Sequence, residues 1–269
     1  SMLYMYVMAL GSDLAPKLLH YFFLLLLVAA LFRIGRRLEG SRTASLAVLL
    51  FVGQWCVTHG VQRANVDFHY SFYASLTLFL LIELWMDGGR EDGLLLAGCF
   101  LGTAMASKLT SIATLIGAES LMILFLWRKK VQLRDFISFN VAALLLFVPY
   151  LLRNFIWTGD PLCWFLSKHL NTFGVITKAQ LTFMDTLAEC LTPPPSISLL
   201  AAGPILAYLY GAFPTVVFDG FITPLFLVGI PLAILVLRRE KWFVPVMLSL
   251  SAYYAVWILL LPRIRHLLP

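Results

Sequence analysis

The apolar runs of this chain constrain its fold more than any other feature. Most of them are close to the length at which a helix, rising about 1.5 Å per residue, crosses a hydrocarbon core of about 30 Å. Hydrophobic residues make up 61% of the 269 residues and charged residues only 13%, and the charges cluster between the runs. A soluble domain has no need of so much apolar sequence. The sequence therefore predicts an all-α fold, a polytopic bundle of transmembrane helices.

About eight spans are predicted. Six follow from separate apolar runs, at 14–32, 44–60, 68–86, 136–152, 221–237 and 243–261. The other two come from residues 93–127, which contain no long polar break. As one helix this 35-residue run would be about 50 Å long and would hold Lys108 near the bilayer centre, at considerable cost. A break between Ser107 and Thr110 gives two short spans and moves Lys108 to a membrane surface.

The distribution of Lys and Arg predicts the orientation. Four short loops carry 12 of the 20 basic residues, at 33–43, 87–92, 128–135 and 238–242. The 67-residue segment 153–219 carries only three. Because cytoplasmic loops are enriched in Lys and Arg, we expect the four short loops inside and segment 153–219 outside. The net charge of +6 then reflects topology rather than nucleic-acid binding.

The predicted domain organisation has three parts. Residues 1–152 hold six spans, residues 153–219 form an external loop with an interfacial helix at 198–213, and residues 220–269 hold two further spans. The chain starts at Ser1 with no signal peptide before the first span and ends in a basic segment. We therefore expect it to be a fragment of a longer protein.

Three cations stand alone at the outer ends of predicted spans, where the positive-inside rule disfavours them: Arg63, Lys108 and Arg153. An anionic group held at the outer leaflet, such as a lipid phosphate or pyrophosphate, would explain their presence. Snorkelling of each side chain to the interface is the alternative. The two explanations weigh equally for any single residue. For the three together, with carboxylates interleaved, a binding site is favoured.

Asp67 opens the third predicted span. A carboxylate at this position caps a helix by accepting bonds from the first N–H groups, or it serves a surface cavity as a base or by orienting an acceptor. The two roles are compatible, and the sequence leaves both open. His59, Asn65 and His169 belong to the same set of polar residues expected at the outer surface.

Other residues allow both functional and structural interpretations. Glu119, near the middle of the fifth predicted span, fits a proton relay, but a protonated or hydrogen-bonded packing residue is favoured. Cys163 and Cys190 share the external loop and are able to pair there, whereas Cys56 and Cys99 are interpreted as buried thiols. No HExxH, CxxC, P-loop or Rossmann glycine pattern occurs. The sequence assigns no cofactor and leaves room for a divalent metal.

Several short motifs occur in a fixed order along the chain. They are Asn65-Val66-Asp67, Gly98-Cys99-Phe100-Leu101-Gly102, Ala106-Ser107-Lys108-Leu109-Thr110, Pro149-Tyr150-Leu151-Leu152-Arg153-Asn154, Thr158-Gly159-Asp160-Pro161, Phe218-Asp219-Gly220 and Arg265-His266-Leu267-Leu268-Pro269. With these motifs the chain resembles the GT-C class of membrane glycosyltransferases over nearly its whole length. It is most similar to the bacterial branch related to protein O-mannosyltransferases and to the aminoarabinose transferase of lipid A.

The resemblance implies an active site at the outer face of a bacterial cytoplasmic membrane and a polyprenyl-phosphate-linked sugar as donor. It implies that Asp67 is the second external acidic residue of the family and that Lys108 lies near the lipid phosphate. Arg153 and His169 match the family more loosely. The principal catalytic aspartate of the family lies in an earlier loop, which the resemblance places before residue 1. Residues 162–165 depart from the Pro-Phe-type ending of this branch.

We therefore expect a glycosyltransferase that moves a sugar from a polyprenyl-phosphate donor to an unspecified acceptor, surrounded by membrane lipids and with no nucleic-acid partner. In such a displacement at the anomeric carbon, a carboxylate activates the acceptor and cations stabilise the departing phosphate. Two alternatives remain open. One is a transporter or flippase of lipid-linked sugars, which usually shows repeats and polar groups at mid-membrane, and the other is a non-catalytic membrane subunit.

Overall fold

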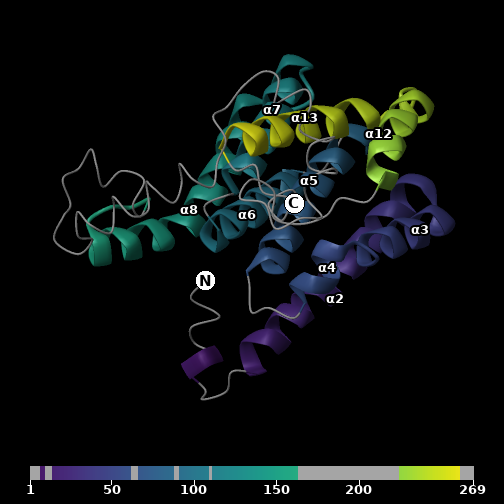
Figure 1. Cartoon of the computed structure of the whole chain (residues 1–269). Coiled ribbons are helices and arrows are strands. Elements are labelled where there is room, and N and C mark those ends of the chain that lie inside the picture. The colour runs from purple at the N-terminus through teal and green to yellow at the C-terminus, as the bar shows by residue number, and fades with distance from the viewer. Residues whose placement is uncertain are drawn as a thin grey trace.

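The computed structural model describes residues 7–9, 14–61, 66–87, 91–108, 111–162 and 224–260, and the regular elements of these residues are all helical (Figure 1). The helices are α2 (Leu14–Glu39), α3 (Ser41–Val52), α4 (Trp55–Gly60), α5 (Asp67–Asp87), α6 (Glu91–Ser107), α7 (Ile112–Trp127), α8 (Leu133–Thr158), α12 (Pro224–Leu237) and α13 (Phe243–Leu260). The predicted all-α fold is confirmed for this part of the chain.

The main apolar core lies between α5, α6, α7 and α8. Leu81, Leu101, Leu121 and Phe139, one from each of these helices, are completely buried in a single cluster. Outside this core, α13 lies along α7, and α2 packs against both α3 and α5 (Figure 1). Residues far apart in the sequence are thereby brought to the two ends of α5.

Two glycines let α6 and α8 approach each other closely. A Cβ atom on Gly98 would lie 2.3 Å from the Phe139 carbonyl oxygen, and one on Gly102 would lie 2.2 Å from that of Ala143. Small residues at such a spacing allow close packing of membrane helices. Because the two contacts advance together along both helices, α6 and α8 run in the same direction, and their carboxyl ends lie at the same end of the bundle.

The predicted break within residues 93–127 is confirmed. α6 ends at Ser107 and α7 begins at Ile112. The Lys108 amide still donates to the Ala104 carbonyl at 3.3 Å, as the last bond of the α6 ladder. Lys108 therefore lies at the carboxyl end of α6 rather than inside a long helix, as the cost of a central charge requires.

The predicted loop 33–43 is wrong. α2 continues to Glu39, so that the arginines of this segment lie mostly in its last turns, and only Gly40 separates α2 from α3. Gly40 adopts φ 89°, which an L side chain rarely takes and which allows the abrupt reversal. Cations are favoured in the last turn of a helix, because they interact with its dipole, and so the basic segment does not end α2.

The predicted span at 44–60 is not one continuous helix, and whether it crosses the membrane stays a prediction. α3 stops at Val52 and α4 starts after Gly53 and Gln54. The buried Gln54 side chain donates to the Leu50 carbonyl at 2.8 Å and so competes for backbone groups of α3. A polar amide beside a glycine thus interrupts an otherwise apolar run.

The predicted span 136–152 is too short. α8 extends to Thr158, in spite of Pro149 inside it, and ends where Gly159 adopts φ 71°. Arg153, the first residue after the predicted span, therefore lies within the carboxyl-terminal turns of α8.

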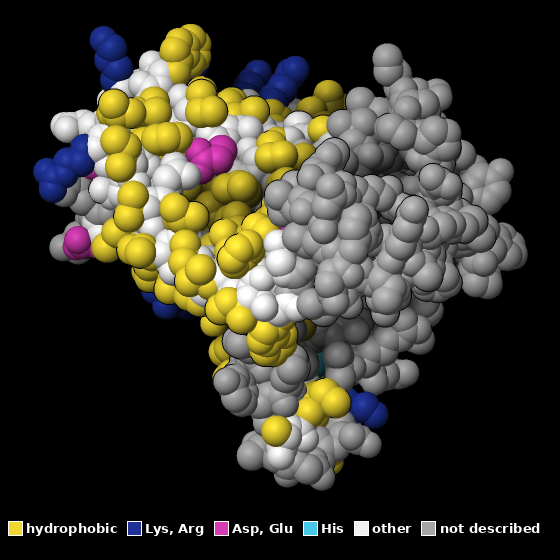
Figure 2. All heavy atoms as spheres, turned by 90° about the vertical axis from the view of Figure 1, so that its left-hand side faces the viewer, with side chains coloured by type: hydrophobic (Ala, Val, Ile, Leu, Met, Phe, Trp, Pro, Cys, Tyr) yellow, Lys and Arg dark blue, Asp and Glu magenta, His cyan; other side chains and the backbone are white. Residues whose placement is uncertain are grey.

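The described surface is largely apolar. Hydrophobic side chains dominate the described part of the face in Figure 2, with Lys and Arg mostly near its margins. Leu145 on α8 is 66% exposed and Ile156 is 75% exposed. An exposed apolar surface of this extent marks contact with lipid or with another protein. It agrees with the prediction of a membrane protein.

Among the described residues, two helices have the length and hydropathy to cross a membrane by themselves, Leu14–Glu39 and Leu133–Trp157. Shorter apolar helices lie at Ser41–Val52, Asp92–Ser107, Ile112–Trp127 and Phe243–Val256. The total of about eight spans and the three-part division of the chain stay predictions. The interfacial helix at 198–213 and the Cys163–Cys190 pair lie outside the described residues.

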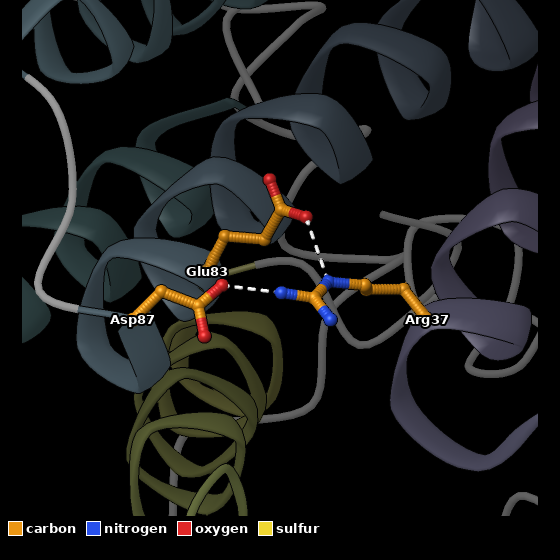
Figure 3. A network of polar contacts seen from close by, with 3 residues as sticks. All are labelled: Arg37, Glu83 and Asp87. Atoms are coloured by element: carbon orange, nitrogen blue, oxygen red, sulfur yellow. Dashed lines mark hydrogen bonds and ion pairs between the residues drawn. The ribbon is translucent and has the colours of Figure 1, made fainter.

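One end of the bundle is held by an ion-pair network between α2 and α5. Figure 3 shows the Arg37 guanidinium between two carboxylates of α5. It donates to Asp87, and its Nε lies 3.5 Å from Glu83 Oε1. Asp87, the last residue of α5, therefore supplies a contact to α2. All three side chains remain partly exposed, so the network adds only modest stability.

Further contacts join the other basic loops to the same end. The Trp85 indole N–H donates to the Lys241 carbonyl at 2.8 Å, and Lys130 donates to the Trp85 carbonyl. The Trp242 indole N–H donates to Glu39 Oε1 at 3.2 Å. We call this end, with Arg37 and Trp85, the basic end. The opposite end, where α5 begins and α6 finishes, is the site end.

Candidate functional site

The candidate site is built on the first turn of α5. Asp67, the first residue of that helix, accepts a hydrogen bond from the ammonium group of Lys108 at the carboxyl end of α6. The Asp67 and Lys108 side chains are only 16% and 19% exposed. Each charge also lies at the helix end that favours it, the anion at an amino terminus and the cation at a carboxyl terminus. The sequence predicted both residues but not that they pair.

A second link joins the same two helix ends. Ser107 Oγ lies 2.7 Å from His69 Nδ1 and donates to the Thr103 carbonyl, also at 2.7 Å. A hydroxyl has a single proton, and a carbonyl oxygen only accepts. With that proton given to Thr103, His69 Nδ1 must carry the hydrogen and donate to Ser107. This bond count assigns the tautomer of the imidazole.

Aromatic contacts hold the α5 turn against α2. The Phe68 ring stacks on His20, with centroids 4.4 Å apart, and Phe23 meets His69 edge-on at 4.3 Å. Tyr73 also meets the His69 ring, with centroids 5.1 Å apart, and lies 6.2 Å from Phe23. His20 is completely buried and His69 nearly so, which fixes both rings in place.

The fourth residue of the turn reaches two more helices. The Tyr70 hydroxyl lies 2.6 Å from Thr114 Oγ1 on α7 and 3.3 Å from the Tyr253 hydroxyl on α13. All three side chains are buried. Successive residues of α5 from Asp67 to Tyr70 thus contact α6, α2, α7 and α13, which makes this turn the junction of the site end.

Sequence reasoning did not single out the buried polar residues of this junction. They lie inside or at the edge of apolar runs, where a polar residue is ordinarily interpreted as part of the packing: His20, His69, Tyr70, Ser107 and Tyr253. A usable signal was their clustering near Asp67 and Lys108: two of the five are within three residues of Asp67, and Ser107 adjoins Lys108.

Arg153 has local contacts. Its guanidinium donates to Asn154 Oδ1 at 2.7 and 3.2 Å and lies over the rings of Tyr150 and Trp157, 4.8 and 5.6 Å from their centroids. Asn154 in turn donates to the Pro161 carbonyl at 3.2 Å. Within the described part of the chain, no ion pair or hydrogen bond joins Arg153 to Asp67 or Lys108. Their shared use of one cavity stays a prediction.

The remaining predicted site residues are not covered. Arg63, Asn65 and His169 lie outside the described residues. His59 belongs to α4, and its side chain is likewise outside the described set. Among the described side chains, no cluster of three or more His, Cys, Asp and Glu is arranged to hold a metal ion.

Glu119 lies on α7, where it meets the Asn140 side chain of α8. Asn140 also donates to the Phe136 carbonyl at 3.1 Å. One carboxyl oxygen of Glu119 is buried without a hydrogen-bond partner. This contact fits the favoured interpretation, a hydrogen-bonded packing residue between two helices, which stays a prediction.

The apolar surface, the helical fold and the polar junction at one end define a helical membrane protein with a polar site at its helix ends. The sequence profile of the dolichyl-phosphate-mannose-protein mannosyltransferase family matches residues 3–153. The chain belongs to this family of membrane glycosyltransferases. The matched region includes α2 to α7 and α8 as far as Arg153, and it contains every described candidate site residue except Tyr253. Searches of curated proteins and of solved structures gave no match.

Proposed function

We propose that this protein transfers a sugar from a polyprenyl-phosphate-linked donor to an acceptor at the outer face of a bacterial cytoplasmic membrane. The observation that carries the proposal is the Asp67–Lys108 pair. It lies at the site end, whereas the loops rich in Lys and Arg gather at the basic end. By the positive-inside rule the basic end faces the cytoplasm, which puts the pair at the outer surface.

The pair suits the chemistry of this transfer. The acceptor oxygen forms a bond to the anomeric carbon, the bond from that carbon to the phosphate oxygen breaks with its electron pair left on the phosphate, and the acceptor proton passes to the Asp67 carboxylate. Lys108 stabilises the charge of the departing phosphate, as an ammonium group does in a partly desolvated site. When phosphate takes over Lys108, Asp67 is released to accept a hydrogen bond from the acceptor hydroxyl and orient it.

Arg153 is proposed as a second phosphate contact. α6 and α8 run in the same direction, so Lys108 and Arg153 lie toward the same end of the bundle. A guanidinium binds phosphate oxygens through two parallel bonds, which an ammonium group does not. The contacts with Tyr150 and Trp157 hold the guanidinium on an exposed part of α8, within reach of a headgroup.

The first prediction tests Lys108. In full-length protein reconstituted in proteoliposomes, Lys108→Ala should weaken use of a polyprenyl-phosphate sugar by about 10- to 100-fold, since one charge-assisted contact to phosphate is lost. Lys108→Arg should retain part of the activity. Transfer of radiolabelled sugar from donor to acceptor measures both effects.

Lys17→Ala is the matched control, because Lys17 is an exposed lysine of α2, a helix that also reaches the site end through His20. It should leave transfer unchanged. Equal transfer by wild-type protein and Lys108→Ala would contradict the proposed role. Movement of intact lipid-linked sugar across the bilayer, without transfer, would favour the flippase alternative.

A further inference from the structure

We propose that His69 and Ser107 are positioning residues, whose hydrogen bond holds the end of α6 so that the Lys108 ammonium meets the Asp67 carboxylate. The kinetic part of this inference rests on the proposed function, while the structural part does not. Neither residue was a candidate from the sequence. Their role follows from the hydrogen bond that the fold forms between them at the site end.

The two links share the same helix ends. His69 follows Asp67 by two residues at the start of α5, and Ser107 directly precedes Lys108 at the end of α6. Lys108 itself has a long, flexible side chain, whose immobilisation costs entropy. The Ser107 side chain is short, and its Oγ lies 2.7 Å from His69 Nδ1. This hydrogen bond fixes the backbone from which Lys108 extends. A fixed backbone reduces that cost.

The end of α6 needs such a link. The Lys108 amide bonds to Ala104 at 3.3 Å, a long bond typical of a fraying last turn. The Ser107 hydroxyl closes this turn on its own helix by donating to Thr103, and its oxygen is thereby oriented to accept from His69. The bond between α5 and α6 therefore has one defined direction, from imidazole N–H to hydroxyl oxygen.

His69 is a rigid donor. Phe23 meets its ring edge-on, Tyr73 flanks it, and the residue is only 7% exposed. A ring packed in this way does not rotate to other partners, so the position of Nδ1 is set by α2 and α5 together. The bond to His69 thus fixes the end of α6 relative to α5, the helix that carries Asp67.

Simple packing is the competing explanation. α5 and α6 also touch through Tyr73 and Phe100, with ring centroids 5.9 Å apart. If packing alone sets the helix ends, removing one hydroxyl from Ser107 should not matter locally. His69→Phe should not matter either, because it keeps an aromatic ring in contact with Phe23 and Tyr73.

The test combines hydrogen exchange with donor kinetics on the full-length protein in nanodiscs. Ser107→Ala and His69→Phe remove the bond. Ser107→Thr keeps the hydroxyl, and His69→Asn keeps an N–H at the place of Nδ1. Thr103→Ala is the matched control, because Thr103 donates to its own helix at Cys99, at 2.9 Å, and has no described bond to α5.

We expect Ser107→Ala and His69→Phe to speed amide exchange over residues 104–108 by about fivefold, the loss of roughly one hydrogen bond. Exchange elsewhere in α5 and α6 should stay unchanged. The KM for a polyprenyl-phosphate sugar should rise by a similar factor with little change in kcat. Ser107→Thr, His69→Asn and Thr103→Ala should behave as the wild-type protein does.

Wild-type exchange at 104–108 in both Ser107→Ala and His69→Phe would overturn the inference. A uniform rise over all of α5 and α6 would also overturn it, in favour of packing. If the local effect on exchange is found but the wild-type protein transfers no sugar from any polyprenyl-phosphate donor, the positioning role stands and the proposed function fails.

Discussion

At the residue scale, the Asp67–Lys108 pair joins two helices, and we propose that it also takes part in catalysis. The pair is mostly buried, so each charge depends on the other for compensation, and the loss of one partner leaves an unpaired charge. The same burial strengthens the electrostatic effect of Lys108 on a phosphate. The proposed function therefore couples stability and activity at this pair, and measurements of both are needed.

The second prediction is a double-mutant cycle on this pair. Asp67→Asn and Lys108→Met should each lower the free energy of unfolding by about 1–3 kcal/mol. The double variant should lose less than the sum, with a coupling of about 1 kcal/mol. Thermal unfolding in detergent provides the stabilities. Additive losses would show that the two side chains do not interact in the membrane-embedded protein.

The third prediction concerns Arg153. Arg153→Gln should raise the KM for a lipid-phosphate donor by about tenfold, through the loss of a bidentate phosphate contact, and should leave the unfolding temperature nearly unchanged. Arg128→Gln is its control. Arg128 also lies over a tryptophan ring, 4.9 Å from the Trp127 centroid, but close to the basic end. Equal effects of the two changes on KM would refute the assignment of Arg153.

At the element scale, the close approach of α6 and α8 sets where the site end lies. The backbone contact at Gly102 leaves no space for a methyl group, since a Cβ atom there would overlap the Ala143 carbonyl. The α6 end, with Ser107 and Lys108, is about one and a half turns beyond this contact. A shift between the two helices at Gly102 would therefore move the ion pair as well.

The fourth prediction follows from this contact. Gly102→Ala should destabilise the protein by about 3 kcal/mol, because the carbonyl of α8 has to move. Gly93→Ala is the matched control on the same helix, with open space around the added methyl group, and should be neutral or slightly stabilising. Thermal unfolding of the two variants measures the difference. A stable Gly102→Ala protein would show that α6 and α8 are further apart than described.

At the scale of the whole molecule, the two ends of the bundle carry different chemistry. The basic end combines Arg37, Lys130 and the two tryptophans Trp85 and Trp242 in partly exposed contacts. The site end combines buried polar links with a single ion pair among the described side chains. This asymmetry supports the proposed function, in which the site end binds a lipid-linked substrate at one face of the membrane.

The fifth prediction is the orientation of these ends. Single cysteines at Lys129 and Arg239, in a background without the native cysteines, should be labelled only after permeabilisation, as the positive-inside rule requires. Cysteines at Lys178 and Asp185, in the predicted external segment, should react with an impermeant maleimide in intact cells. External labelling at Lys129 would reverse the orientation and remove the support for an outer site.

The sequence by itself determined the helical class and the break at Lys108. The length of the 93–127 run and the cost of its central charge admit no single helix, and neither argument needs a neighbouring element. It also identified Asp67 and Lys108 as candidates. It misplaced the ends of α2 and α8. Both helices continue beyond their apolar runs, α2 through its arginines and α8, in spite of Pro149, through Arg153, and each ends next to a glycine.

Only the tertiary structure decided which side chains meet. Asp67 pairs with Lys108 and not with Arg153, because the antiparallel packing of α5 and α6 brings the start of one to the end of the other. The same packing brings together His69 and Ser107, which are 38 residues apart in the chain. Hydropathy and charge determine whether a segment lies in lipid or in water. Which side chains contact each other depends on packing between helices, and the sequence of a single helix does not determine that packing.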